Sequence, residues 1–217
     1  MNRLFNMDNG FFRVLTKIVD CVWLSILFLV TSIPVFTIGV SMTSLYYAVQ
    51  KSLKNDRGYV SSEYFHAFKT NFKQSTLIWL LVLIIGIVLS VDVRIMRVMD
   101  EAGQALGKAW LLFGALLVLL VLWTIYLFPY IARFENGTKA IMKNAAYIAI
   151  LNFPRTLLLI VCIVVAALLV YIIPITIFIV PALFTLVQNL IMEKIFRKYM
   201  SEEDRAAEDE LNREFKN

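Results

Sequence analysis

The chain has 217 residues, of which 60% are hydrophobic, and its mean hydropathy is +0.74. This composition is too apolar for an ordinary soluble domain and predicts an all-α, polytopic helical membrane protein surrounded by a lipid bilayer. The formal net charge is +5, but no soluble segment carries basic residues interleaved with aromatic ones, so nucleic acid is not an expected partner.

Residues 1–17 are predicted to form an amphipathic interfacial helix, because Leu4, Met7, Phe11 and Val14 recur at helical spacing. An ordinary cytosolic lead-in is the alternative for this segment. The apolar run that follows has no small-residue cleavage site, so we expect it to remain in the protein as a membrane anchor.

Six apolar segments are predicted to cross the membrane, within a membrane domain over residues 18–196. They are residues 18–33, 39–53, 75–91, 109–131, 156–173 and 175–196. The second segment is short, because 15 residues of helix reach about 22 Å and the hydrocarbon core is about 30 Å thick.

Further helices are expected outside these spans. Ser61–Gln74 is predicted to lie at the interface, Thr138–Asn152 to form a short helix between two spans, and residues 197–217 to form a polar cytoplasmic helix. Ser201 and Asp204 have the spacing of a capping box at the start of this last helix. The predicted interfacial face of Ser61–Gln74 consists of Tyr64, Phe65, Phe68 and Phe72.

The basic residues decide between two topologies. With six crossings, 18 of the 21 Lys and Arg residues fall on the side of both termini, and only Arg94, Arg97 and Lys108 fall on the other. If residues 39–53 do not cross, this asymmetry largely disappears. The positive-inside rule therefore predicts six spans with cytoplasmic N and C termini.

The turn after the first span is the most distinctive stretch of the sequence. Pro34 removes a backbone donor and Gly39 gives conformational freedom, so the chain is expected to reverse there. The next helix carries small residues at helical spacing, which let helices approach closely and suit helix packing or contacts with a partner. These candidate contact residues are Pro34, Gly39, Ser41, Ser44, Ala48 and Ser52.

No catalytic set is recognisable in the sequence. The single histidine, His66, is expected at the surface, and Asp20 and Asp92 are predicted near opposite membrane boundaries. Cys21 and Cys162 lie in apolar runs and are expected to be inert packing residues. We therefore expect no enzymatic activity, no cofactor and no metal.

Hydroxyl and amide side chains are the main polar groups within the predicted spans. Hydrogen bonding between helices is one interpretation of these groups, and a sugar-binding lining is the other. They include Ser25, Thr31, Ser32, Thr37, Ser41, Thr43, Ser44, Thr124, Thr176, Thr185, Gln188 and Asn189.

Two stretches of the first ninety residues resemble the YesL family of bacterial multi-pass membrane proteins. They are Pro34-Val-Phe-Thr-Ile-Gly39 with Ser41, Thr43 and Leu45-Tyr46-Tyr47, and Tyr64-Phe65-x-x-Phe68-Lys69-x-Asn71-Phe72-Lys73. The resemblance implies a bacterial plasma-membrane protein, often encoded beside sugar importers and polysaccharide-degrading enzymes. It implies no activity, because none is established for the family.

With the absence of a recognisable catalytic set, this resemblance predicts an accessory or interaction partner of a carbohydrate (oligosaccharide) ABC importer, bound to permease or ATPase subunits. The alternative is a stand-alone channel or facilitator for a neutral solute. Thr138–Asn152 has the placement of the helix through which importer permeases bind their ATPases, but Gly137 and Pro154 are too far apart for the permease signature.

Overall fold

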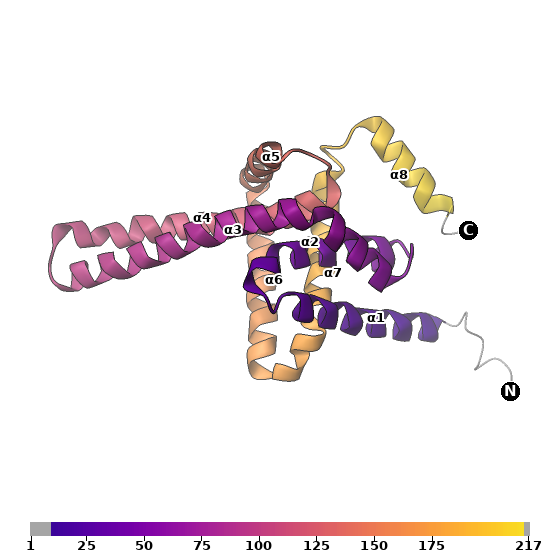
Figure 1. Ribbon diagram of the computed structural model, residues 1–217, viewed down its shortest axis with the longest axis horizontal. Helices are drawn as coiled ribbons and strands as arrows, with labels where there is room; N and C mark the ends of the chain where they lie inside the picture. Colours follow the sequence, from indigo (N-terminus) through magenta and orange to yellow (C-terminus); the bar gives the residue numbers. More distant parts are fainter. Residues whose placement is uncertain (1–9, 215–217) are drawn as a thin grey trace.

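The computed structural model describes the backbone over residues 10–214 and the side chains of residues 14–211 and 213. Helices occupy almost all of this range and no strand occurs within it, so the predicted all-α fold is confirmed (Figure 1). Most of the amphipathic helix predicted over residues 1–17 lies outside the described residues.

The α-helices, in chain order, are α1 (Gly10–Thr31), α2 (Ile38–Ala48), α3 (Val60–Glu101), α4 (Trp110–Arg133), α5 (Thr138–Leu151), α6 (Phe153–Ile172), α7 (Val180–Phe196) and α8 (Glu202–Glu214). Short 3₁₀ or π-helical turns connect some of them: η1 (Val35–Thr37), η2 (Val49–Lys54), η3 (Ala105–Ala109) and η4 (Pro174–Phe178).

Four helices of the described chain are long and apolar enough to cross a membrane. They include Val14–Thr31, Val60–Glu101, Ala105–Arg133 and Phe153–Ile172. The other two predicted spans are shorter: α7 has 17 residues, and α2 has 11 before it passes into η2. The structure thus supports a multi-pass membrane protein, while six crossings stay a prediction.

Helix α3 differs most from its prediction. The sequence suggested an interfacial helix over residues 61–74 and a separate span over residues 75–91. Instead, one continuous helix of 42 residues, about 63 Å long, covers both and continues to Glu101. No proline interrupts this stretch, and a helix satisfies its own backbone hydrogen bonds on both sides of the membrane boundary. Similarly, α1 runs without a break across residue 18, where a boundary was expected.

The helices are arranged as two groups that run in different directions. Figure 1 shows α1, α2, α3 and α4 running alongside one another, with the α3–α4 hairpin extending to one side and the α6–α7 hairpin running across this group. At the tip of the α3–α4 hairpin, Gly107 lies against the Asp100 backbone so closely that a Cβ atom would clash with it. Only glycine permits this approach.

Helix α2 lies at the centre of the packing. It contacts α1, α3, α4 and α7, and most of its residues are buried. A Cβ atom on Gly39 would lie 2.5 Å from Trp79 Cβ and 2.9 Å from the Ser75 carbonyl oxygen, so this glycine is required for the contact with α3. Thr43 and Ser75 share a hydrogen bond of 3.0 Å across the same contact.

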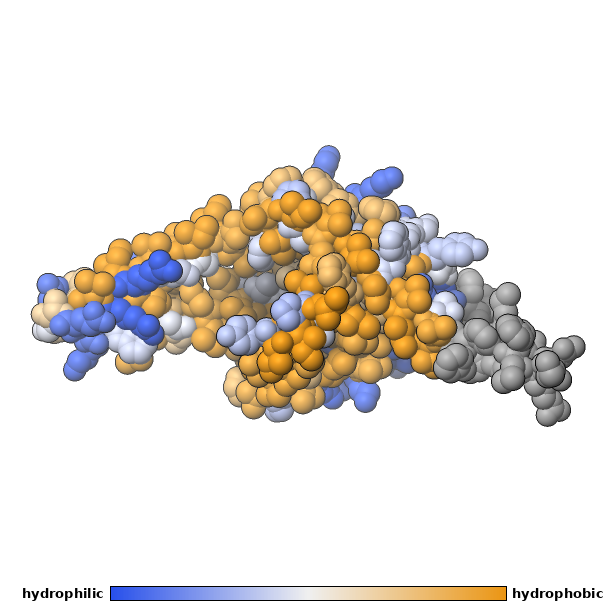
Figure 2. Space-filling view, turned by 90° about the horizontal axis from the view of Figure 1, so that it is seen from below, coloured by the Kyte–Doolittle hydropathy of each residue, from blue (hydrophilic) through white to orange (hydrophobic). Residues whose placement is uncertain are grey.

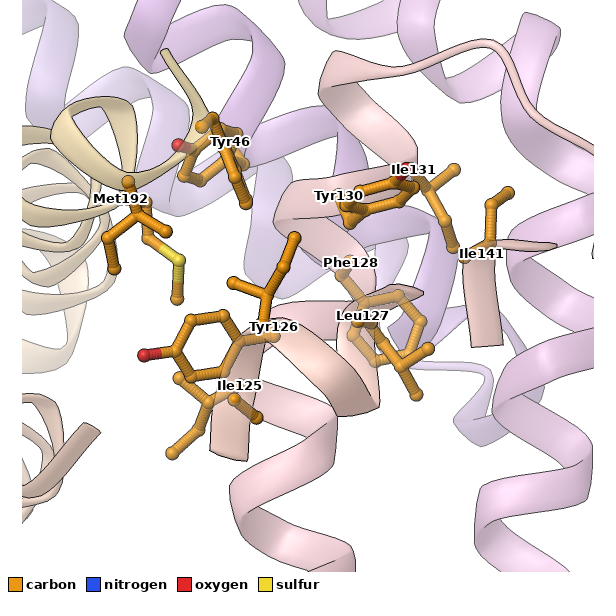
Figure 3. Packing of buried hydrophobic residues seen from close by; sticks show 14 of the residues in the cluster. Tyr46, Ile125, Tyr126, Leu127, Phe128, Tyr130, Ile131, Ile141 and Met192 are labelled. Carbon is orange, nitrogen blue, oxygen red and sulfur yellow. The ribbon is translucent and has the colours of Figure 1, made fainter. Parts of the chain in front are cut away.

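The larger hydrophobic cluster surrounds the C-terminal part of α4. Its members include Tyr126, Phe128 and Tyr130 from α4, with Tyr46 from α2 and Met192 from α7. Figure 3 shows these side chains on different sides of α4, so that one helix joins α2, α5 and α7 into a common core.

Candidate functional site

The two hairpins leave an apolar groove between them. The groove has a volume of about 1080 Å³ and is lined mainly by aliphatic and aromatic side chains of α3, α4, α6 and α7. Figure 2 shows the molecule from below, with apolar side chains over both hairpins and a recess between them. This groove is wide enough to receive another molecule.

The hydroxyl groups in the groove are used within their own helices. Ser90, Thr124 and Thr185 each donate a hydrogen bond to the carbonyl oxygen four residues earlier, over 2.6, 2.7 and 2.8 Å. Their donors are therefore not directed at a ligand, and this part of the lining is less polar than its composition suggests.

A hydrogen bond from a side-chain amide replaces the backbone hydrogen bond that a proline removes from α4. Pro129 lies inside α4 and has no N–H, so the Ile125 carbonyl oxygen lacks its usual helical donor. The Gln188 side chain of α7 donates to that oxygen over 3.0 Å. A buried backbone acceptor is thus satisfied, and α4 is joined to α7.

A polar cluster lies at the C-terminal end of α4, around Arg133. The Glu193 carboxylate is buried, accepts a hydrogen bond from the Tyr46 hydroxyl over 3.3 Å and lies 3.3 Å from Arg133 Nε. Arg133 also pairs with Glu208 of α8. Burial lowers the pKa of Lys54, which donates to Asn189 over 3.1 Å, while the Glu193 carboxylate opposes this shift.

Helix α8 is fixed to this cluster by charge. A second ion pair joins Arg197 to Asp209 over 2.7 Å. At the start of the helix, the Asp204 N–H donates to the Ser201 hydroxyl oxygen over 3.1 Å, which confirms the predicted cap. The polar cytoplasmic helix expected from residue 197 therefore begins at Glu202 and docks on the protein.

The predicted contact residues around the first turn are mainly internal. Pro34 is exposed at the turn, whereas the other five are buried against the rest of the chain. These five are Gly39, Ser41, Ser44, Ala48 and Ser52. Their contacts in this structure are therefore packing contacts within one molecule, and none of the five presents a free face to a partner.

The predicted interfacial aromatic residues do not share one environment. Tyr64 is completely buried and its hydroxyl lies 2.6 Å from the Thr31 hydroxyl, so it belongs to the core and not to the interface. Phe65 and Phe72 are 42% and 37% exposed, and Phe68 is half-buried. Helical spacing placed Tyr64 with the phenylalanines, but its hydroxyl finds partners only inside the protein.

Sequence reasoning missed two features of the site. The proline inside the apolar stretch 109–131 was a signal for an unpaired carbonyl, but its partner Gln188 could not be named from the sequence. Glu193 near the end of the last span was a signal for a buried ion pair. Lys17 pairs over 2.9 Å with Asp56, which is too distant in the sequence to be named as its partner.

Within residues 10–214, no group of His, Cys, Asp and Glu side chains is arranged to hold a metal ion. Cys21 and Cys162 are free thiols. His66 lies on the exposed side of α3, with its ring 6.3 Å from that of Tyr47.

Residues 21–93 match the model of a family described as a protein of unknown function, DUF624. The match spans α1, α2 and most of α3, which is the region that resembles the YesL family, and it is consistent with that resemblance. No curated protein and no solved structure matches the chain.

Proposed function

We propose that this chain is a non-enzymatic accessory subunit of a carbohydrate ABC importer, embedded in a bacterial plasma membrane with six crossings and cytoplasmic termini. The observation that carries the proposal is helix α5, which stands between α4 and α6 and offers a fixed surface to a partner subunit.

One face of α5 is held firmly by the protein. Ile141, Ala145 and Ile148 are buried against the core, and Trp123 Nε1 donates to the Met142 carbonyl oxygen over 3.0 Å. Asn144 also donates to the Tyr130 hydroxyl over 3.0 Å. A helix fixed in this way can bind a partner without first losing conformational entropy.

The opposite face of α5 is apolar and open. Tyr147, Ile150 and Leu151 are 61%, 74% and 54% exposed. Aromatic and aliphatic anchors of this kind, next to the exposed Lys139 and Lys143, suit an interface with an apolar centre and a polar rim. We infer that this face contacts a permease or ATPase subunit.

The groove favours this role over the alternative, a stand-alone channel or facilitator for a neutral solute. Recognition of a sugar requires convergent donors and acceptors within the site. In the described groove, the hydroxyl donors of Ser90, Thr124 and Thr185 and one amide donor of Gln188 are already engaged with backbone carbonyls.

Affinity purification from native membranes in a gentle detergent tests the proposal. Permease or ATPase subunits should co-purify with the wild-type chain and be lost from Ile150→Ser. Ile175→Ser is the matched control, because Ile175 has the same exposed fraction, 74%, but lies in η4. Absence of importer subunits from the wild-type sample contradicts the proposal, and solute flux in proteoliposomes without a partner supports the alternative.

The proposed topology has a separate test. Because α3 is one long helix, Tyr59 and Gln104 lie beyond its opposite ends, and both are exposed. Single cysteines at these positions, in a chain lacking Cys21 and Cys162, report sidedness to an impermeant thiol reagent. We expect labelling of Gln104→Cys in intact cells and of Tyr59→Cys only after permeabilisation. The reverse result contradicts cytoplasmic termini.

A further inference from the structure

Among the described residues, Arg94 is the one charged side chain that lines the groove. Ile87, Ser90, Val91 and Arg94 follow one another along the face of α3 that lines the groove. Arg94 is exposed, and none of the described side chains forms an ion pair or hydrogen bond with its guanidinium group. An exposed guanidinium group at the edge of an apolar groove can pair with an anion from outside the protein.

Other charges at this end of the hairpin are already engaged. The Arg97 guanidinium lies 4.7 Å from the centre of the Trp110 ring, and Trp110 Nε1 donates to Asp100 over 3.2 Å. Asp92 and Glu101 do not line the groove. Glu101 lies seven residues beyond Arg94, about 10 Å along the helix axis. Arg94 is therefore available to an external anion.

The apolar part of the groove has the extent of a lipid tail. From Trp79 to Arg94, the lining of α3 extends over 16 residues, and the two ends lie about 22 Å apart along the helix axis. A partner helix of that length, about 10 Å in diameter, would occupy about 1700 Å³. The groove holds about 1080 Å³, which is too little for such a helix but suits flexible acyl chains.

We propose that the groove is a binding site for an anionic phospholipid. Its acyl chains lie along α3, α4 and α6, and its phosphate pairs with Arg94. A guanidinium group forms bidentate, charge-assisted hydrogen bonds with phosphate, and the low polarity of the surroundings strengthens them. In the proposed topology Arg94 lies toward the outer side, so the ligand comes from the outer leaflet. The site itself does not depend on an importer partner.

Native mass spectrometry of the purified, delipidated full chain tests this proposal. The protein is titrated with phosphatidylglycerol or with phosphatidylcholine of the same acyl chains. We expect one phosphatidylglycerol to bind in preference to phosphatidylcholine, and Arg94→Gln to weaken that binding about five- to tenfold. Arg97→Gln is the matched control, since it removes the same charge one turn away and outside the groove lining.

A second variant tests the apolar part independently. A Cβ atom on Gly86 would lie 3.6 Å from Leu120, so Gly86→Phe fills the groove without a backbone clash at Cβ. It should prevent retention of the lipid while Arg94 remains in place. Equal losses in Arg94→Gln and Arg97→Gln, or unchanged retention in Gly86→Phe, would overturn the proposal. The midpoint of thermal unfolding shows that each variant is folded.

Discussion

The region around α2 and the outer parts of the α3–α4 and α6–α7 hairpins are both built from apolar helices. The side chains of the first region are buried, whereas many of those in the second are exposed. In the first, Val40, Ala48 and Val49 are completely buried. In the second, Leu119 of α4 and Val164 of α6 are 58% and 52% exposed. Hydrophobicity therefore does not decide which helices pack together.

Small and hydroxyl-bearing residues account for the difference. Gly39, Ser41, Thr43 and Ser44 let α2 approach its neighbours and supply hydrogen bonds at the contacts, as between Thr43 and Ser75. The outer parts of the hairpins present mainly branched aliphatic residues. Lipid tails solvate these as well as another helix does, so nothing draws these outer parts together.

The largest effect is expected where the packed region contains charge. Arg133→Ala removes the partner of the buried Glu193 and should lower the free energy of unfolding by about 3–5 kcal/mol. Arg197→Ala breaks an ion pair of half-exposed side chains and should cost about 0–1 kcal/mol. Thermal unfolding in detergent measures both. Equal shifts would contradict the assignment of Glu193 to a buried cluster.

Crowding α2 should have the next largest effect. Gly39→Ala places a methyl group 2.5 Å from Trp79 Cβ and should destabilise the fold by about 1–3 kcal/mol, because the core must be displaced. The control is Gly114→Ala in α4, where a Cβ atom meets nothing within 4 Å. If both variants unfold at the wild-type temperature, the close contact between α2 and α3 is wrong.

The hydrogen bond from the Gln188 side chain to the Ile125 carbonyl oxygen links α7 to α4 beside the groove. Gln188→Leu leaves the carbonyl oxygen without a donor and should cost about 1 kcal/mol. In a Pro129→Ala background the residue at position 129 regains its N–H and can donate to that oxygen, so Gln188→Leu should then have little effect. A double-mutant cycle on unfolding measures this coupling, and additive effects would argue against it.

The smallest effect is expected on the outer surface. Leu119→Ala removes a side chain that faces the bilayer and should change stability by no more than about 0.5 kcal/mol. A loss of several kcal/mol in membranes, measured by resistance to unfolding in nanodiscs, would show that another protein covers this face.

Features that depend on composition or on residues close together in the sequence could be predicted from it. The helical class, the turn after Pro34 and the cap at Ser201 follow from composition, backbone chemistry and spacing, and the structure agrees with all three. The continuous course of α3 was missed, because charged residues within it were taken to mark boundaries although they do not break a helix.

Only the tertiary structure decided which apolar faces meet. It buried Tyr64, joined Gln188 to the carbonyl freed by Pro129, paired Lys17 with Asp56 and left a groove beside Arg94. Hydropathy is the same for a side chain facing lipid and for one facing another helix, so the sequence predicted that these helices lie in a membrane. Which helices touch depends on shape and on a few polar partners far apart in the chain.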